Sequence, residues 1–170
     1  MKKILAMLLL IISGCTGIPE NIQPVTGFQL NNYLGKWYEV ARLDHSFERD
    51  LTQVSAEYSL REDGSVKVIN RGFLPAKQEW KQAEGWAYFM QQPDVGYLKV
   101  SFFRPFYGSY IVIALDKQNY QYSLVTSSDK SYLWILARTP QLNPQVQAEL
   151  IAKAKALGFE TEKLIYPEQK

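Results

Sequence analysis

The chain has 170 residues with 19 Lys and Arg against 17 Asp and Glu, and it contains one cysteine and one histidine. The balanced charge, without a basic run, excludes the electrostatic footprint of a nucleic-acid-binding protein. A lone cysteine excludes an internal disulfide, and these counts leave no thiolate or histidine cluster, so we expect no metal site and no cofactor. The unusual feature is 14% aromatic residues, which are typical of β-sheets and of apolar sites with a wet edge.

Residues 1–14 have the pattern of a signal peptide. Met1, Lys2 and Lys3 give a basic start, and residues 4–12 form an unbroken apolar run too short to span a bilayer as a folded helix. The run ends in Ile-Ser-Gly-Cys at residues 12–15, which resembles the lipobox of bacterial lipoproteins. This resemblance implies cleavage before Cys15, followed by diacylglycerol on its sulfur and an acyl chain such as palmitate on its amino group. The alternative is an ordinary signal peptide with a chance cysteine.

Several acyl chains on one residue give stable anchoring to a membrane. Thr16 stands where the rule for retention in the inner membrane requires Asp, so we expect Cys15 to anchor the protein in the outer membrane. Residues 15–27 carry Pro19 and Pro24 and show no apolar period, and we interpret them as a lipidated tether. Residues 28–170 remain for a single domain, which is a normal length for one substantial core.

From Gly35 onward, apolar runs bounded by turn residues recur at the spacing typical of an all-β sandwich or barrel. The links are short, as at the Glu-Asp-Gly turn of residues 62–64, and leave no room for the crossover helices of a parallel sheet. We therefore predict sequential antiparallel pairing. The eight predicted strands are residues 37–43, 52–60, 65–73, 80–90, 97–103, 109–115, 120–127 and 132–139.

Alternation predicts which side chains face inward. It is clearest in the second strand, where Val54, Ala56 and Tyr58 share one face. In the later strands both faces are apolar, which indicates burial on both sides and a cover on the outside. One cover is an amphipathic helix that begins at the Asn143-Pro144 cap and ends at Gly158. Because one helix cannot cover several strands, a second subunit in a homodimer is the natural supplement; residues 163–166 are expected to return beside the first strand.

The first strand carries the family resemblance. Gly35 is suited to a sharp turn and Trp37 to the burial of a large ring, although a core tryptophan occurs in any β-domain. Residues 32–38 resemble the Gly-x-Trp signature of lipocalins, and residues 132–140 resemble the last-strand motif of that family with its arginine at Arg138. Residues 41–49 and 99–108 resemble the bacterial outer-membrane lipocalins more specifically. The Thr-Asp-Tyr motif of the family is kept only loosely at residues 126–129.

This resemblance implies an all-β fold, an eight-stranded antiparallel up-and-down lipocalin barrel with a C-terminal α-helix packed on its outside. It implies that Arg138 lies across Trp37 and seals the barrel floor by a cation-π contact. It also implies binding, storage or transport of fatty acids or lysophospholipids at the outer membrane, in support of membrane maintenance. The side chains that we expect to line the ligand cavity are Val54, Ala56, Tyr58, Val66, Val68, Asn70, Leu98, Val100, Phe102, Tyr110, Val112, Trp134 and Leu136.

Other functions stay open at this point. His45 is the only histidine and cannot be matched with a serine by spacing, so we do not expect an enzyme. A carrier of haem, with His45 as axial ligand, or of a retinoid-like molecule would also suit an apolar barrel. A structural envelope lipoprotein would instead fill its interior with large side chains. The small inward residues Ala56, Val66, Val68 and Val112 favour an interior with space.

Overall fold

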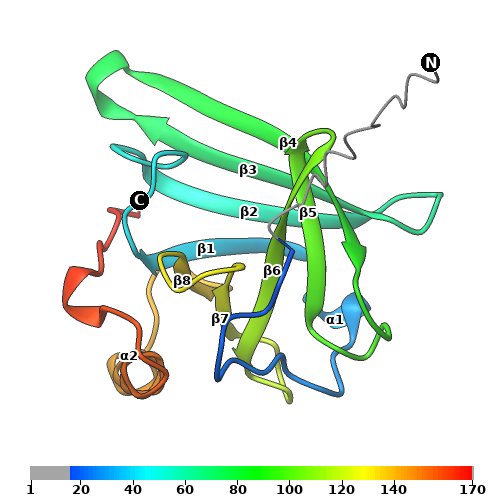
Figure 1. The fold of residues 1–170 in the computed structure, drawn as a ribbon. Coiled ribbons are helices and arrows are strands. Elements are labelled where there is room, and N and C mark those ends of the chain that lie inside the picture. Colours follow the sequence, from blue (N-terminus) through cyan, green and yellow to red (C-terminus); the bar gives the residue numbers. More distant parts are fainter. Residues whose placement is uncertain (1–15, 170) are drawn as a thin grey trace, which may run out of the picture.

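The computed structural model describes residues 16–169, which form a closed eight-stranded β-barrel with one helix beside it (Figure 1). Each strand pairs antiparallel with the next, and β8 pairs with β1, which confirms the predicted topology. Cys15 and the signal peptide lie outside the described residues. The strands are β1 (Gly35–Arg42), β2 (Thr52–Leu60), β3 (Val66–Leu74), β4 (Glu79–Phe89), β5 (Tyr97–Phe103), β6 (Phe106–Leu115), β7 (Tyr122–Thr126) and β8 (Leu133–Ala137).

The two ends of the barrel differ. The β2–β3 turn and the short helix α1 (Leu30–Tyr33) lie at the closed end, and Gly64 in that turn has the positive φ of +82° that the sequence predicts. The β1–β2, β5–β6 and β7–β8 loops and the long β3–β4 hairpin lie at the open end (Figure 1). A short 3-10 turn, η1 (Pro75–Lys77), caps that long hairpin. β6 begins at Phe106 and not at residue 109, because Phe106 pairs with Phe103 across a tight hairpin.

The closed end is sealed as the family resemblance implies. Trp37 is fully buried, and its indole Nε1 donates a hydrogen bond of 2.8 Å to the carbonyl of Tyr33 at the end of α1. The guanidinium carbon of Arg138 lies 4.0 Å from the centre of the Trp37 ring. Gly35 has φ +93°, a backbone conformation that favours glycine, and a Cβ there would lie in van der Waals contact with the Arg138 Nη1 atom at 3.4 Å.

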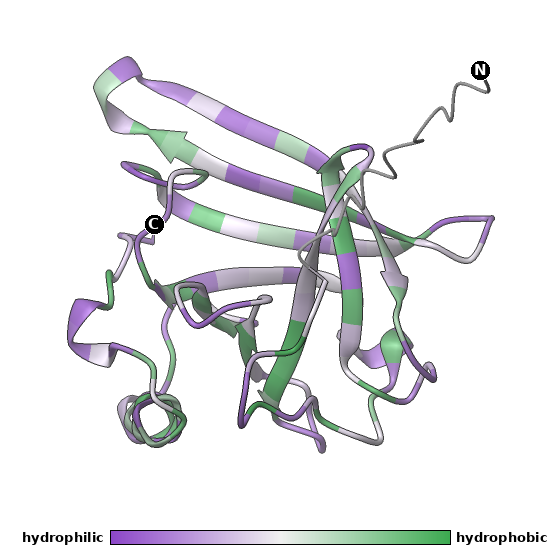
Figure 2. Cartoon of the chain, viewed as in Figure 1, coloured by the Kyte–Doolittle hydropathy of each residue, from purple (hydrophilic) through white to green (hydrophobic). Residues whose placement is uncertain are grey.

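The outside of the barrel is covered where β6, β7 and β8 are apolar on both faces (Figure 2). The helix α2 (Pro144–Ala156) begins at an Asn143 side chain that accepts bonds from the Gln145 and Val146 amides, and ends before Gly158, as predicted. Leu150 and Ala154 of this helix pack in one buried cluster with Ile111, Ile113 and Ile135 of the barrel. Among residues 16–169 no helix is long and apolar enough to span a bilayer.

The segment of residues 16–27 supplies a second cover, and the prediction of a tether misses its packing. Ile22 is buried in the same outer cluster as α2. The Val25 amide donates to the Val112 carbonyl at 2.8 Å, and the Val25 carbonyl accepts from the Gly96 amide at 2.8 Å. The segment therefore lies along β5 and β6, and part of the surface that we assigned to a second subunit is covered by the chain itself.

The C-terminal segment fills a gap between β1 and β2, which pair only through Gly35–Tyr38 of β1. The Gln169 side-chain amide donates to the Glu39 carbonyl at 2.7 Å and to the Val54 carbonyl at 2.9 Å. The prediction of a short strand at 163–166 is wrong in extent. Residues Thr161–Lys163 form a 3-10 turn, η2, and only Ile165 forms a bridge to Arg42.

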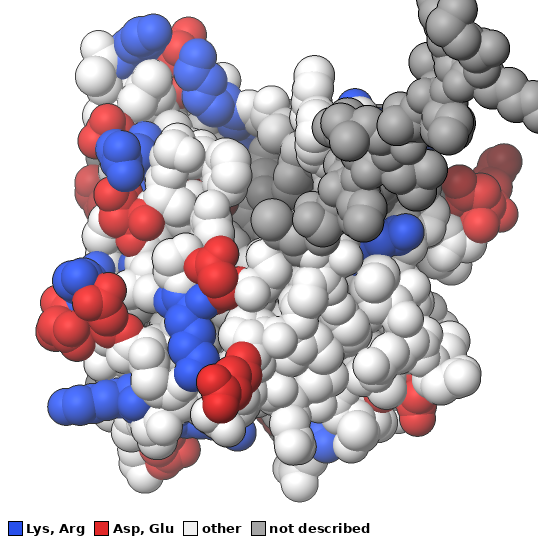
Figure 3. All heavy atoms as spheres, viewed as in Figure 1, with Lys and Arg blue, Asp and Glu red and all other residues white. Residues whose placement is uncertain are grey.

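Charged residues of both signs are interspersed on the face shown in Figure 3, where Lys and Arg lie beside Asp and Glu. The long β3–β4 hairpin is the most polar part of the barrel (Figure 2). Glu84 on β4 pairs with Lys67 of β3 at 3.3 Å and with Arg61 of the β2–β3 turn at 2.5 Å. Such exposed pairs contribute little to stability, so the apolar core and its outer covers hold the barrel.

Candidate functional site

The barrel interior contains a cavity of about 690 Å³ at its open end. This volume lies within the range of natural ligand pockets. Its walls come from residues of all eight strands, and its mouth is lined by residues of the β1–β2 and β7–β8 loops and by the tip of the β5–β6 hairpin at Phe103 and Phe106. The cavity exists because Ala56, Val68 and Val100 project short side chains into the middle of the barrel.

The structure places most of the predicted cavity residues on this wall. Val66 and Leu98 instead line a separate void of about 20 Å³ near the closed end, and Val112 lines neither space. Val112 is fully buried beside Trp37 and Val125 in the core that fills the closed end. Strand alternation assigns a side chain to the interior, and it cannot tell an empty interior from a filled one. On the wall of the large cavity lie Val54, Ala56, Tyr58, Val68, Asn70, Val100, Phe102, Tyr110, Trp134 and Leu136.

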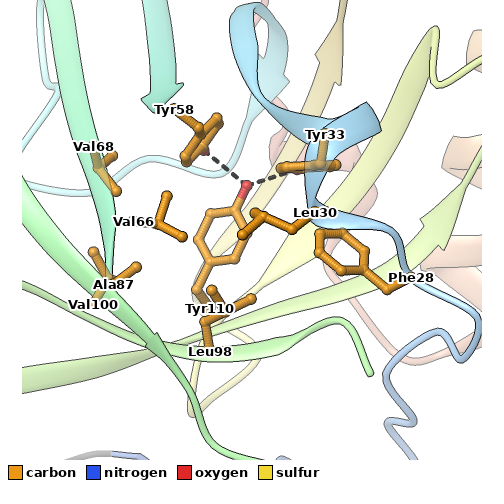
Figure 4. A pocket seen from close by; sticks show the side chains of 10 residues that line it. All are labelled: Phe28, Leu30, Tyr33, Tyr58, Val66, Val68, Ala87, Leu98, Val100 and Tyr110. Carbon is orange, nitrogen blue, oxygen red and sulfur yellow. Dashed lines mark hydrogen bonds between the residues drawn. The ribbon is translucent and has the colours of Figure 1, made fainter. Parts of the chain in front are cut away.

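A cluster of tyrosines separates the cavity from the small void (Figure 4). The Tyr110 hydroxyl lies 2.7 Å from that of Tyr33 and 2.8 Å from that of Tyr58. The Tyr33 hydroxyl is also 3.2 Å from the Ser123 hydroxyl, which continues the chain of hydrogen bonds. Burial raises the pKa of Tyr33 to about 12. These side chains are therefore neutral at ordinary pH and form a firm cavity floor.

A second polar cluster lies under the mouth, and sequence reasoning did not find it. Glu39 and Arg42 are each 2% exposed, and their side chains meet at 2.6 Å. Arg42 also donates to the Glu48 carbonyl at 2.8 Å, and the Trp134 indole donates to the Glu48 carboxylate at 3.1 Å. His45 Nε2 lies 3.0 Å from the same carboxylate. The cluster ties the β1–β2 loop to β1 and β8.

The cluster forms because the pairing register of β1 is irregular. The register against β8 gains one residue in β1 between Glu39 and Ala41, which is the mark of a β-bulge. The bulge changes the alternation of β1, so that Glu39 and Arg42 come together although three positions separate them. In a regular strand, residues three positions apart point to opposite faces, so alternation alone does not bring Glu39 and Arg42 together, and only the fold shows that both are buried.

The two carboxyl groups of the cluster have opposite pKa shifts. Burial, and then the nearby Glu48 charge, raise the pKa of Glu39 well above its ordinary value, against the effect of Arg42. Burial acts to raise the pKa of Glu48 too, but hydrogen bonds from His45 and Glu39 lower it on balance. These opposite shifts favour a proton on Glu39, which then donates to the Glu48 carboxylate. The cluster then holds one carboxylate charge beside the Arg42 charge.

Within residues 16–169, no three His, Cys, Asp or Glu side chains are grouped in a way that could hold a metal ion. His45 is 6% exposed and lies among the rings of Phe47, Tyr132 and Trp134, at 5.2 to 5.6 Å between centroids. It lines the cavity, but its Nε2 atom faces Glu48. The polar groups that could meet a ligand head group, Asn70, Arg71, Lys81, Gln82 and Asp129, lie on the outer part of the wall.

The comparisons with known proteins agree with this geometry. A family model described as a lipocalin-like domain matches residues 28–169. The chain belongs to the lipocalin family. The outer membrane lipoprotein Blc of Vibrio cholerae is 55% identical to this lipocalin over 159 residues, which cover 94% of the chain and 93% of that protein. The Blc protein of Escherichia coli K12 is 50% identical over 89% of this chain and 85% of its own length.

Solved structures extend the likeness in fold alone. The cockroach allergen Per a 4 superposes with a TM-score of 0.71 at 19% identity, over 91% of this chain and 96% of that one. Insecticyanin from the tobacco hornworm superposes with a TM-score of 0.69 at 20% identity, over 91% of this chain and 87% of that one.

With its outer membrane lipoprotein relatives at 50 to 55% identity, this lipocalin is a lipid-anchored protein of the cell outer membrane that binds a small hydrophobic ligand.

Proposed function

We propose that this lipocalin binds fatty acids or lysophospholipids, and stores or transports them at the bacterial outer membrane in support of membrane maintenance. The observation that carries the proposal is the cavity of about 690 Å³, which is apolar in its depth and polar toward its mouth. Each methylene of an acyl chain buried there contributes about 0.8 kcal/mol, so a long chain can drive binding unaided. The lipid anchor that we predict at Cys15 would keep the cavity beside a supply of such lipids.

The polarity of the wall supports a lipid with a head group. Val54, Ala56 and Leu136 line the apolar part. Two cations line the outer part, namely Arg71, whose guanidinium lies 4.4 Å from the centre of the Trp80 ring, and Lys81, which pairs with Glu79 at 2.5 Å. A carboxylate or a phosphate at the end of an acyl chain would be complementary to Lys81 and would compete there with Glu79. A neutral retinoid-like ligand has no anionic group for this contact.

We propose binding and not catalysis. The one histidine of the sequence faces Glu48, and the hydroxyls nearest the cavity floor bond to one another. A haem ligand at His45 would require Nε2 to leave Glu48, at the cost of one of the contacts of a buried carboxylate. A structural envelope lipoprotein is disfavoured because an interior filled by side chains would not leave a cavity of this size.

The experiment is native purification of the mature chain with Cys15→Ser, followed by extraction into organic solvent and mass spectrometry. We expect long-chain fatty acids or lysophospholipids in the extract, at a level near one per protein. Visible absorbance of the same sample separates the alternatives, since haem or a polyene would colour it. A colourless protein that yields no lipid and binds no added fluorescent fatty acid would contradict the proposal.

A further inference from the structure

Three phenylalanines at the open end are exposed to a degree that is unusual for such large apolar side chains. Phe103 is 76% exposed, Phe47 is 74% exposed and Phe106 is 62% exposed. We call these three residues the aromatic rim. The rings of Phe103 and Phe106 lie nearly parallel, with centroids 6.3 Å apart, at the tip of the β5–β6 hairpin. A contiguous apolar surface that stays in water marks an interaction site.

The positively charged side chain of Arg104, which lies between Phe103 and Phe106 in the sequence, points away from the tip of the hairpin. Arg104 follows Phe103 in the chain, and its guanidinium lies 4.4 Å from the centre of the Trp86 ring on β4. Its Nη2 atom donates to the Tyr88 hydroxyl at 2.8 Å. The cation is thus held against the wall of the barrel, which leaves the Phe103 and Phe106 rings as the outermost groups of the hairpin.

The aromatic rim is continuous with the cavity. Phe47, Phe103 and Phe106 all line its mouth. Phe102, which is 40% exposed, lies next along β5 and continues the apolar surface inward. An acyl chain that enters or leaves the cavity therefore passes over these rings.

The same hairpin holds the first described residues of the chain. The Ser109 hydroxyl of β6 donates to the Gly17 carbonyl at 2.6 Å, and the Tyr97 hydroxyl of β5 donates to the Thr16 carbonyl. Ser109 is three residues from Phe106, or about 10 Å along a strand. Tyr97 is six residues from Phe103, or about 20 Å along β5. Because Cys15 is covalently joined to Thr16, an anchor on Cys15 would start from the same strand pair that carries the aromatic tip.

We propose that the aromatic rim docks into the lipid surface of the membrane, so that the cavity mouth faces the bilayer and lipid passes between them without crossing water. This inference rests on the proposed function and adds the route that the ligand takes. Aromatic rings are suited to the interface between lipid head groups and acyl chains. The predicted anchor favours a membrane over a protein partner, because the residues that follow Cys15 are bonded to β5 and β6, the two strands that end in Phe103 and Phe106.

The test measures how a fluorescent fatty-acid analogue moves from vesicles to the protein. The donors are vesicles of phosphatidylethanolamine with a minority of phosphatidylglycerol, and the acceptor is the mature chain with Cys15→Ser, which keeps every described residue. If the protein docks, the transfer rate rises in proportion to protein concentration. If the analogue must first leave the vesicle through water, the rate stays constant, and that result would overturn the proposal.

The key variant is Phe103→Ser with Phe106→Ser, for which we expect the concentration-dependent rate to fall roughly tenfold. Phe103→Trp with Phe106→Trp should restore it, because tryptophan also partitions into the interface. Leu60→Ser is the matched control, since Leu60 is 53% exposed at the closed end and should change the rate by less than about twofold. Equal losses in the Leu60 and the Phe103/Phe106 variants would contradict a docking role for the rim.

Two further measurements distinguish the docking proposal from the proposed lipid-binding function and from dimerisation. Direct titration with the free analogue tests binding, so a protein that binds it but shows no concentration-dependent transfer retains the proposed function and loses the docking proposal. Sedimentation of the wild type and the serine variant tests whether a second copy of the chain, and not a membrane, covers the aromatic rim. A dimer that dissociates in the serine variant, with vesicle transfer unchanged, would assign the rim to a second copy of the chain.

Discussion

The guanidinium of Arg138 lies 4.0 Å from the centre of the Trp37 ring and also donates to the carbonyls of Asn32, Lys36 and Tyr120, at 2.8, 2.9 and 3.1 Å. One side chain thus joins α1, β1 and the β6–β7 loop. Burial lowers the pKa of Arg138, but an arginine stays charged under any ordinary condition. The contact is therefore both a seal over the tryptophan and a clamp for the segments around it.

Trp37→Ala should lower the free energy of unfolding by about 3 to 5 kcal/mol, because it removes a fully buried ring and leaves the Tyr33 carbonyl without its donor. Arg138→Ala should cost less, since this side chain is only partly buried. Arg138→Lys is the control that keeps the charge and loses the three-way clamp. Denaturant titration measures all three. A Trp37→Ala protein within about 1 kcal/mol of the wild type would contradict the assigned barrel floor.

The tyrosine floor predicts a fall in stability at alkaline pH. The pKa of Tyr33 is about 12 in the folded protein and 10.0 ordinarily, so the neutral form is favoured by folding. The stabilisation is fully present below pH 10 and is lost as the pH rises toward 12, by about 2 to 3 kcal/mol. Unfolding titrations across this range should show the decline. Tyr33→Phe should make it shallower without abolishing it, because burial also raises the pKa values of Tyr58 and Tyr110. An equally steep decline in that variant would argue against Tyr33 as a cause.

The buried cluster predicts unequal effects for its two glutamates. Glu39 is the neutral partner, so Glu39→Gln keeps a similar shape and should cost about 1 kcal/mol or less. Glu48→Gln removes the one carboxylate charge near Arg42 and should cost about 3 kcal/mol. Thermal melts at neutral pH compare the two variants directly. The reverse order of stability would show that the proton is carried by Glu48.

The anchor predicts a change of location without a change of fold. Cys15→Ser should abolish incorporation of a clickable fatty acid and move the protein out of the outer-membrane fraction. The barrel should remain folded, because Cys15 precedes every residue of the described core. Undiminished labelling of the Cys15→Ser protein would place the lipid on another residue.

The barrel and its floor could be predicted from the sequence, because strand alternation and two short family motifs indicate them. Val54, Ala56 and Tyr58 alternate with polar residues along β2, and this period fixes the inward face. The pairing of Trp37 with Arg138 joins residues about a hundred positions apart, and it was reached only through the family resemblance. Neither residue alone distinguishes a lipocalin floor from an ordinary core.

The features that the sequence did not predict depend on contacts between distant segments, which no local sequence pattern indicates. Residues 16–27 have too few apolar positions for a period, so the burial of Ile22 depends on the outer surface of the barrel that receives it. Val112 faces inward as predicted, but it meets a filled core because Trp37 and Tyr33 occupy the closed end. Glu39 and Arg42 are buried because a bulge in β1 turns them toward the β1–β2 loop. Each of these depends on segments distant in the sequence.

The central claim is that the barrel holds its ligand in the open cavity, and the matched pair Ala56→Trp and Ala87→Trp tests it. Ala56 lines the cavity of about 690 Å³, whereas Ala87 lines only the void of about 20 Å³ and is 4% exposed. An indole at residue 56 enters empty space, whereas one at residue 87 must force apart a packed core. Ala87→Trp should therefore be strongly destabilised, and Ala56→Trp should melt near the wild type.

The most direct measurement is titration of a fluorescent fatty-acid analogue into the wild type and Ala56→Trp, with thermal melts of both samples. We predict that Ala56→Trp raises the dissociation constant by at least about tenfold, while its melting temperature stays within a few degrees of the wild type. An Ala56→Trp protein that is folded and binds the analogue with unchanged affinity would contradict the account, because it would place the ligand outside the cavity.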